Sequence, residues 1–590
     1  MATKFETNKS SVSAQKLRGG YYTPPGLARY LVNWAIRSGQ EHILEPSCGD
    51  GNFIVAALEH LQENQDRWDI RPSTLVAVEA QRDELAKAAS RAKESSNSTT
   101  KTEWVLGDFF DAFESLHTQK FDVILGNPPF IRFQHFDEES RKKAFHLLKH
   151  FGYKPTKLAN VWAAFVQLSI ELLAPNGRLA MVIPAEIMQV QYASELRSRL
   201  VKSFEHITIV GFKKLVFPVI QQEVILLLAE GKRENVFLKM PDLQPRLFSN
   251  GNGSNIPAFT KKMVVDPQQA ASDIHTIEFE DGEELISSGD IANLTAHIPA
   301  KHSRPGMKWT SLFLEEALFE ALDEAEKMPG LKRLGELADV AVGVVTGRNK
   351  FFVLAKETVE QVAAAKFTLP IVGKTSALTS ISFTPHDFDL YVGKYPAYLL
   401  DLTGTDESQF PSTLTDYIES GEKEDIHLGY KCRVRNRWYD VPSIYVPDAF
   451  LFRQIHKYPL LVVNEAKAVS TDTIHRVRFN ENVDARLVAA ASFNSLTLAW
   501  AEVCGRSYGG GVLELEPSEA RELPIPYSEA LSLDFEKVDT LLRRGKYLDA
   551  LDYVDQIVLH DYLGFSPNFS NAIRSAWIQL RDRRINRQHN

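Results

Sequence analysis

Residues 121–130 contain the side chains best suited to chemistry. A short apolar run, 123–125, ends at a glycine and is followed by Asn127, Pro128, Pro129 and Phe130. An uncharged, β-branched run of this kind is typical of a buried parallel strand. The prolines must end it, because they have a fixed φ and no N–H to donate. We therefore expect a rigid loop at the carboxyl end of a strand, where open α/β sheets place their ligands.

This loop could bind the exocyclic amine of a nucleobase. Such an amine is a poor nucleophile because its lone pair is delocalised into the ring. The side-chain oxygen of Asn127 and the backbone carbonyl of Pro128 could accept its hydrogens and favour a pyramidal nitrogen. Phe130 could stack on a base that has left the duplex. The residues alone fit equally well a proline turn, with Asn127 as a turn former and Phe130 in the core.

Three earlier segments are predicted strands that end beside an acidic residue. The first ends at Glu45 and leads into a turn containing Gly49 and Gly51; the next ends at Glu79, and Asp108 follows the third. Parallel strands would place these carboxylates at one edge of the sheet. The turn is neither the GxGxxG pattern nor a P-loop, and its acidic residues would suit an ammonium group better than phosphates. Glu79 could accept from ribose hydroxyls and Asp108 from an adenine amine.

The segment before the first strand predicts a helix. Residues 19–25 form a turn with paired prolines, and apolar residues recur at helical spacing up to Trp34. The exposed N–H groups of this helix and the Thr23 hydroxyl could hold a carboxylate. A capped helix without a ligand explains the same residues.

Strands and helices alternate up to residue 235. A helix over 160–173 is followed by predicted strands at 179–183, 207–210 and 224–228. With the four earlier strands this predicts a doubly wound, seven-stranded α/β domain over 19–235. Phe217, on a loop between the last two strands, is either another aromatic residue of a base pocket or a core residue.

In this order the motifs resemble those of the adenine-specific (N6) DNA methyltransferases of restriction–modification systems, in their gamma class. That class has the cofactor motifs first, the catalytic motif next and the target-recognition domain last. The stretches that carry the resemblance are 20–25, 44–51, 78–79, 107–108 and 127–130.

The resemblance implies S-adenosylmethionine as cofactor, methylation of an adenine N6 amine in double-stranded DNA, and protection of that DNA from a cognate restriction endonuclease. It implies that Thr23 and Glu45 bind the methionine part of the cofactor, that Glu79 binds its ribose and that Asp108 binds its adenine ring. The implied cofactor site comprises Tyr22, Thr23, Glu45, Ser47, Gly49, Gly51, Glu79, Asp108 and Asn127. The implied catalytic residues are Asn127, Pro128, Pro129 and Phe130, with Phe130 and Phe217 stacking on the flipped base. No metal is implied.

The second half is expected to recognise DNA. We predict a flexible N-terminus over 1–18, an irregular connector over 236–306, a mixed α+β target-recognition domain over 307–527 and a helical segment over 528–590. Residues 430–439 alternate bases with other residues, so on a strand the bases would form one positive face. The alternative is an exposed, solvated strand face. The residues expected to contact DNA are Arg348, Lys350, Lys431, Arg433, Arg435, Arg437 and Arg506.

Composition restricts the class of protein. The 590 residues carry a net charge of −9, which disfavours a nucleic-acid ligand unless local basic patches overrule it. The three cysteines are too scattered for a disulfide framework or a zinc cluster. No apolar run is long enough to span a bilayer, and residues 1–18 lack an apolar signal core. We expect a cytosolic protein with no membrane partner, and the resemblance implies that the cytoplasm is a prokaryotic one.

Two other functions fit parts of the sequence. The loop at 127–130 would also suit methylation of another planar amine, such as cytosine N4, a guanine amine in RNA or a protein glutamine. A DNA-binding specificity protein with an inert methyltransferase half is the alternative from another class. The intact acidic and catalytic motifs argue against such decay, and any endonuclease is expected to be a separate protein.

Overall fold

The computed structural model describes residues 22–68, 74–95, 100–156, 159–217, 223–234, 272–303, 306–508 and 510–586. The chain forms two compact units that divide between Phe313 and Leu314, here called unit 1 and unit 2. The predicted flexible segment 1–18 and residues 236–271 of the predicted connector lie outside the described residues.

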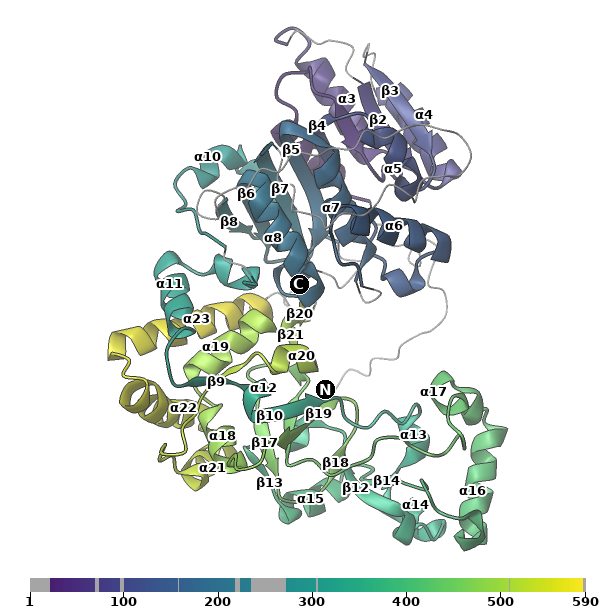
Figure 1. The fold of residues 1–590 in the computed structure, drawn as a ribbon, viewed down its shortest axis with the longest axis vertical. Helices are drawn as coiled ribbons and strands as arrows, with labels where there is room; N and C mark the ends of the chain where they lie inside the picture. Colours follow the sequence, from purple (N-terminus) through teal and green to yellow (C-terminus); the bar gives the residue numbers. More distant parts are fainter. Residues whose placement is uncertain are drawn as a thin grey trace. The chain divides into compact units, whose positions relative to one another are not determined.

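Unit 1 is built on one eight-stranded sheet in the order β3-β2-β1-β4-β5-β7-β6-β8 (Figure 1). Neighbouring strands from β3 to β5 are parallel, β7 is antiparallel to β5 and β6, and β8 is parallel to β6. The strands are β1 (Ile43–Glu45), β2 (Thr74–Glu79), β3 (Lys101–Leu106), β4 (Phe121–Gly126), β5 (Leu173–Pro184), β6 (Phe204–Phe212), β7 (Val224–Lys232) and β8 (Asp273–Phe279).

Two groups of helices flank this sheet, so the predicted doubly wound α/β class is confirmed. In one group α2 packs on α3 and α3 on α4; in the other, α7 contacts α5, α6 and α8. The helices of unit 1 are α2 (Pro25–Ala35), α3 (Asn52–Glu63), α4 (Arg82–Ser95), α5 (Phe109–His117), α6 (Glu138–His150), α7 (Val161–Leu172), α8 (Ser194–Ser203), α9 (Gly282–Ser287) and α10 (Ile291–Thr295).

The central strands follow from their sequence. All three residues of β1 are buried, and so is every residue of β4 except Asp122, as expected for parallel strands covered on both faces. Helix α2 begins at Pro25, whose fixed φ suits a first helical turn, and it buries Leu27, Leu31 and Trp34. The predicted helix and the first four predicted strands are thus present where the periodicity places them.

Two expectations for unit 1 are wrong. In the described residues the sheet has eight strands rather than seven, and the described part of the connector predicted over 236–306 contains the regular elements β8, α9 and α10. Strand β8 pairs with β6 from His206↔Asp273 to Phe212↔Phe279 and so extends the sheet at that edge. The pairing partner lies more than sixty residues earlier in the chain, where local periodicity gives no signal of it.

Unit 2 contains four smaller sheets. Their orders are β10-β19-β15-β17-β13, β11-β14-β12-β18, β16-β21-β20 and β22-β9. The strands are β9 (Leu331–Arg333), β10 (Ala338–Ala341), β11 (Val353–Leu354), β12 (Thr368–Val372), β13 (Ser382–Phe383), β14 (Tyr398–Leu400), β15 (Ala449–Phe452), β16 (Gln454–Ile455), β17 (Leu461–Asn464), β18 (Val469–Ser470), β19 (Ile474–Phe479), β20 (Arg506–Tyr508), β21 (Val512–Glu514) and β22 (Pro524–Pro526).

Helices in unit 2 surround two separate cores. The larger core runs from Leu314 to Leu580, and the smaller one lies between Val344 and Val469. The helices are α11 (Glu316–Ala325), α12 (Leu334–Leu337), α13 (Asn349–Phe352), α14 (Lys356–Gln361), α15 (Pro385–Val392), α16 (Ser412–Lys423), α17 (Tyr430–Arg433), α18 (Ala485–Ala491), α19 (Ser495–Cys504), α20 (Pro517–Ala520), α21 (Phe535–Arg543), α22 (Tyr547–Asp555), a π-helix (Gln556–Tyr562) and α23 (Pro567–Ile585).

The helical segment predicted over 528–590 is helical where the structure describes it, and its apolar residues belong to the larger core together with those of β15 and α19. Of the predicted stripe, Leu551, Val554 and Val558 are fully buried, whereas Leu548 is exposed. These helices therefore stabilise the core of unit 2 instead of forming a separate body.

Among the described residues, no single helix is long and apolar enough to cross a membrane. The bent pair α18 and α19, which meet at 81°, passes such a test only when the two are taken together. Both helices lie in the larger core of unit 2.

Candidate active site

The reversal of strand order in unit 1 places the candidate site. Strand β1 lies between β2 and β4, since the chain first builds the sheet outward to β3 and then returns to the other side of β1. Ligands of open α/β sheets bind at such a switch point, beyond the carboxyl ends of the two strands. Here those ends are Glu45 and the loop that starts at Asn127.

Three predicted site residues meet at this point. The Ser47 hydroxyl donates to the backbone oxygen of Asn127 at 3.4 Å. Gly126 lies directly beside Glu45, because a Cβ placed on Gly126 would be 3.5 Å from Glu45 Cγ. The structure thus brings together the acidic end of β1 and the loop 127–130, as the sequence predicts; their roles in binding remain predictions.

Glu79 and Asp108 extend the same edge. The backbone N–H of Gly49 donates to Glu79 Oε2 at 3.0 Å, and Gln81 N–H donates to Oε1 at 2.8 Å. Gly107 N–H donates to the backbone oxygen of Glu79 at 3.0 Å, which places Asp108 next to the end of β2. Asp108 is half-buried and caps α5 by accepting from Phe110 N–H at 2.8 Å. Capping alone accounts for this aspartate, so its predicted contact with an adenine ring is still a prediction.

The turn after β1 is filled by the chain itself. The Tyr22 ring lies over Gly49, where a Cβ would be 2.9 Å from the ring, and its hydroxyl donates to Glu84 at 2.7 Å. Gly51, the N-cap residue of α3, has a φ of 87°; a Cβ there would come within 2.8 Å of the Cβ of Ala88. The two glycines are therefore required for packing by Tyr22 and α4, a cause that the sequence analysis did not foresee.

Glu45 is a buried carboxylate without a counter-ion in the described part of the chain. It is 1% exposed, and its Oε2 atom has no hydrogen-bond partner there. Burial, with the charges of Asp50 and Glu79 nearby, raises the pKa of Glu45 well above its usual range. By contrast, Asp50 forms an ion pair with Arg91 at 2.7 Å. The buried hydroxyl of Thr23, 3% exposed, also lacks a partner among the described residues.

The unpartnered oxygens of Glu45 and Thr23 are candidate acceptors for a ligand that donates hydrogen bonds. A buried acceptor without a partner costs about 1–3 kcal/mol, and a buried charge costs more unless a counter-ion is present. The site at the end of β1 would regain this free energy by accepting hydrogen bonds from an ammonium group. The described residues contain no group of three or more His, Cys, Asp or Glu that could hold a metal ion.

The loop 127–130 is held at both ends. Pro128 is buried, while Asn127, Pro129 and Phe130 are half-buried, and Phe130 packs against the core that covers β1 and β4. Directly after the loop, Ile131 accepts from Val161 N–H at 2.7 Å and Phe133 N–H donates to Ala159 O at 3.1 Å. These bonds fix the exit of the loop to the start of α7.

Phe217 belongs to the same core and is 7% exposed. A ring buried to this extent offers little surface to a nucleobase. The structure therefore agrees with the alternative in which Phe217 is a core residue. Its burial gives no support to a role in stacking on a base.

Arg91 is a site residue that the sequence analysis missed. One guanidinium nitrogen donates to both the backbone and the side chain of Asp50, at 2.8 and 2.7 Å, and the other donates to Asn52 Oδ1 at 2.6 Å. Asn52 in turn donates to the backbone oxygen of Thr23 at 2.9 Å. Arg91 lies about forty residues from these partners on α4, so no local spacing could reveal the link.

The prediction of a strand with one positive face over 430–439 is wrong. Residues 430–433 form the short helix α17, followed by turns, so the four bases do not share a strand face. Arg435 donates to the backbone oxygens of Val345, Thr346 and Trp438, and Arg437 to Asp440 and two further carbonyls.

Arg506 is likewise engaged within unit 2, in an ion pair with the buried Glu519 at 2.8 Å. Each of Arg435, Arg437 and Arg506 thus stabilises the fold of the unit. The other four predicted DNA contacts, Arg348, Lys350, Lys431 and Arg433, are exposed.

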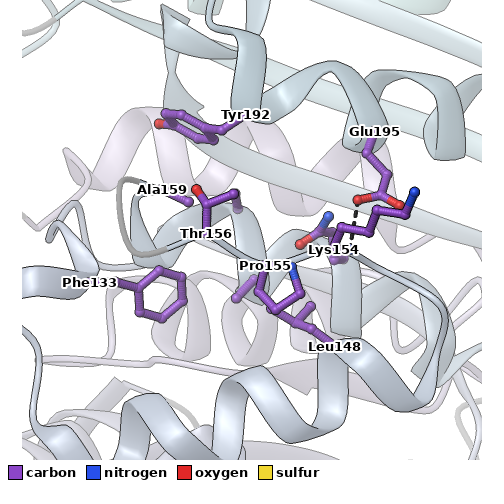
Figure 2. Close-up of a pocket in the computed structure, with 11 residues that line it drawn as sticks. Phe133, Leu148, Lys154, Pro155, Thr156, Ala159, Tyr192 and Glu195 are labelled. Atoms are coloured by element: carbon purple, nitrogen blue, oxygen red, sulfur yellow. Dashed lines mark hydrogen bonds between the residues drawn. The ribbon is translucent and has the colours of Figure 1, made fainter.

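A separate pocket in unit 1 lies against α7 (Figure 2). Phe133 and Tyr192 project toward it, and the backbone N–H of Lys154 donates to Glu195 at 2.9 Å on its rim. None of the predicted catalytic or cofactor residues lines this pocket, so it is distinct from the site at the end of β1.

The fold and the site define the class of protein. It has a doubly wound α/β domain, with acidic residues and an Asn-Pro-Pro-Phe loop at the switch point of its sheet, followed by a second unit. Residues 7–245 match the N-6 DNA Methylase family, and residues 306–559 match the C-terminal domain of the Type II methyltransferase M.Eco57I. These matches and the relatives below support an N6-adenine DNA methyltransferase of a restriction–modification system.

Two relatives and the fold of one solved structure are similar to most of the chain. The Type II methyltransferase M.AccI of Acinetobacter calcoaceticus is 21% identical over 86% of this chain and 85% of its own. M.XamI of Xanthomonas campestris pv. amaranthicola is 24% identical over 87% and 86%. The Type IIL restriction–modification enzyme MmeI, solved in complex with DNA, has a similar fold, with a TM-score of 0.55 and 13% identity over 94% of this chain and 75% of that one.

Proposed function

We propose that the protein transfers the methyl group of S-adenosylmethionine to the N6 amine of an adenine flipped out of double-stranded DNA. The observation that carries this proposal is the position of Glu45, a buried carboxylate without a counter-ion among the described residues, directly beside the loop 127–130. One site thus combines acceptors for a cationic cofactor with acceptors for a planar amine.

The residues at the ends of β1 and β2 fit this cofactor. Glu45 and Thr23 supply the buried acceptor atoms without partners, which suit the ammonium group of the methionine part. Each oxygen of Glu79 accepts one backbone N–H and keeps a further lone pair for a ribose hydroxyl. When bound, S-adenosylmethionine supplies an electrophilic methyl group on a sulfonium. Asp108 remains the candidate acceptor for the adenine amine.

The loop 127–130 would orient the target amine. The side-chain oxygen of Asn127 and the carbonyl of Pro128 accept its two hydrogens and so direct the nitrogen lone pair away from the ring. Phe130 stacks on the base, and the bonds from Ile131 and Phe133 to the start of α7 hold the loop in place. Orientation and exclusion of water supply most of the rate enhancement, and no covalent intermediate with the protein is needed.

The substrate is proposed from the family and from its relatives. M.AccI and M.XamI are Type II methyltransferases, and MmeI was solved with DNA bound. By analogy, this protein would act on duplex DNA in the prokaryotic cytoplasm and protect it from a cognate, separate endonuclease. The order of the motifs, with the cofactor site before Asn127 and unit 2 last, is that of the gamma class.

Labelled S-adenosylmethionine and unmethylated genomic DNA provide the test, with single-molecule sequencing of the product. We expect N6-methyladenine at one recurrent short motif. Asn127→Ala should lower kcat at least about a hundredfold, the usual cost of removing a positioned polar group, whereas Asn33→Ala, at an exposed position on α2, should leave it unchanged.

Other outcomes distinguish the alternatives. Label in RNA, in protein or on cytosine N4 would mean that the catalytic site acts on another planar amine. Failure to bind S-adenosylmethionine, measured by calorimetry, would refute the proposed cofactor site and favour an inert specificity module.

A further inference from the structure

One face of the smaller core of unit 2 is both apolar and basic. Around α17, three large apolar side chains are exposed within seven residues: Leu428 by 59%, Tyr430 by 65% and Val434 by 64%. Exposed apolar groups of this size at one place mark an interaction surface more often than scattered single residues do. Together with four cations they form what we call the α17 surface: Arg348, Lys350, Leu428, Tyr430, Lys431, Arg433 and Val434.

The cations of this surface have no acidic partner within ion-pair distance among the described residues. Arg348, Lys350, Lys431 and Arg433 form no ion pair with any described residue. The two stretches that build the surface, 341–351 and 426–436, contain no Asp or Glu. A solvated surface usually mixes both signs of charge, so four cations without acids favour an anionic partner.

Two segments far apart in the sequence join in this surface. A Cβ placed on Gly347, which has a φ of 82°, would lie 2.8 Å from the Cβ of Lys431, so the loop before α13 packs directly on α17. The cations of α17 also surround Tyr430: Lys431 Nζ lies 5.8 Å and Arg433 Cζ 5.6 Å from the centre of its ring. The positive charge is thus concentrated around one exposed aromatic ring.

Hydrogen bonds of Arg435 and Thr346 hold the α17 surface in one conformation. Arg435 donates to the carbonyls of Val345 and Thr346 at 3.2 and 2.7 Å, and to that of Trp438 at 3.2 Å. Thr346 is 1% exposed, and its hydroxyl accepts from Arg348 N–H at 3.1 Å. A surface that is already ordered loses less conformational entropy when a partner binds.

We propose that the α17 surface is where unit 2 binds duplex DNA. Its four cations contact phosphates of the backbone, and Tyr430, with Leu428 and Val434 beside it, contacts sugars and base edges in a groove. This combination of point charges and an exposed aromatic side chain matches the two components of a DNA site, positioning on phosphates and contact with bases. The inference rests on the proposed function, because it names where the DNA substrate binds.

The salt dependence of DNA binding tests the phosphate contacts. Affinity for a fluorescent duplex of about 30 base pairs is measured by anisotropy between 50 and 200 mM salt, and log K is plotted against log salt. Each phosphate contact adds about 0.9 to the slope, so Lys431→Gln with Arg433→Gln should reduce its magnitude by about 1.8. Lys394→Gln, an exposed lysine after α15 with no ion pair among the described residues, is the matched control and should leave the slope unchanged.

Tyr430→Ala tests the apolar contact. We expect binding to weaken about tenfold at every salt concentration with an unchanged slope, since the ring carries no charge. Cofactor binding and the unfolding midpoint of each variant confirm that the fold is retained, as expected for exposed positions.

Wild-type slopes in the double variant, or an equal loss of slope in Lys394→Gln, would overturn the inference while the proposed function stands. Binding and methylation of RNA or protein instead of duplex DNA by the wild type would overturn both.

Discussion

Replacing Glu45 by glutamine should make the free protein more stable and the cofactor bind less tightly. The carboxylate is 1% exposed and its Oε2 has no partner in the described part of the chain. An unpaired buried acceptor costs about 1–3 kcal/mol, and a glutamine of the same shape removes the charge. We expect Glu45→Gln to raise the free energy of unfolding by about 2 kcal/mol at pH 7.5, which corresponds to a rise in Tm of about 3 °C for a unit of this size.

The effect on binding has the opposite sign. A hydrogen bond to a charged group contributes about 1.5–3 kcal/mol, so losing the charge should weaken S-adenosylmethionine binding about 10- to 150-fold. Thermal unfolding of the free protein and titration calorimetry with the cofactor measure the two effects. Glu103→Gln, at an exposed position on β3, is the matched control and should change neither by more than about 0.5 kcal/mol.

The dependence on pH makes this prediction sharper. The pKa of Glu45 is raised in the folded protein, so above about pH 4.5 the unfolded chain releases a proton that the folded chain retains. Stability of the free protein should therefore fall as pH rises from 4.5 toward the folded pKa, and Glu45→Gln should remove this decline. Cofactor affinity should rise over the same range. A less stable Glu45→Gln variant that binds the cofactor with wild-type affinity would refute the reasoning.

Three further predictions concern unit 2. Glu502→Gln breaks the fully buried ion pair with Arg584, at 2.6 and 2.8 Å, and should lower the free energy of unfolding by about 3–5 kcal/mol in urea denaturation; a loss below 1 kcal/mol would mean that the pair is not formed. Arg435→Ala should cost about 2 kcal/mol, because three carbonyls lose a charged donor, whereas Lys431→Ala should stay within about 0.5 kcal/mol; equal losses would contradict their assignment. Burial lowers the pKa of His475, so below pH 6.5 only the unfolded state takes up the proton, and stability should fall by up to about 1.4 kcal/mol per pH unit; His475→Gln with the same pH profile as the wild type would refute this.

Unit 1 was more predictable from its sequence than unit 2, because local sequence features define its central strands. Strands such as β4 are buried on both faces and end at prolines, so composition and local punctuation define them. The acidic residues and Asn127 come together because parallel strands end at one edge, which fixes their proximity without any knowledge of side-chain packing.

The errors arose where contacts distant in sequence decide the structure. The alternating bases over 430–437 suggest a strand, yet Arg435 and Arg437 are oriented by carbonyls up to ninety residues away. A period of two in charge alone does not determine a strand, because strand formation depends on packing against neighbouring strands. In the same way, β8 forms by adding to β6, and Arg91 reaches Asp50 from another helix.

The bonds between the loop exit and α7 have a consequence for dynamics. Eleven of the twelve residues of α7 are buried, and two backbone bonds tie its start to Ile131 and Phe133. Amide hydrogens at Val161 and Phe133 should thus exchange only when the core itself opens, on the slow timescale of global unfolding. Under the proposed function, a target base would have to adapt to this fixed loop, and the cost of distorting the duplex would fall on the DNA rather than on the protein.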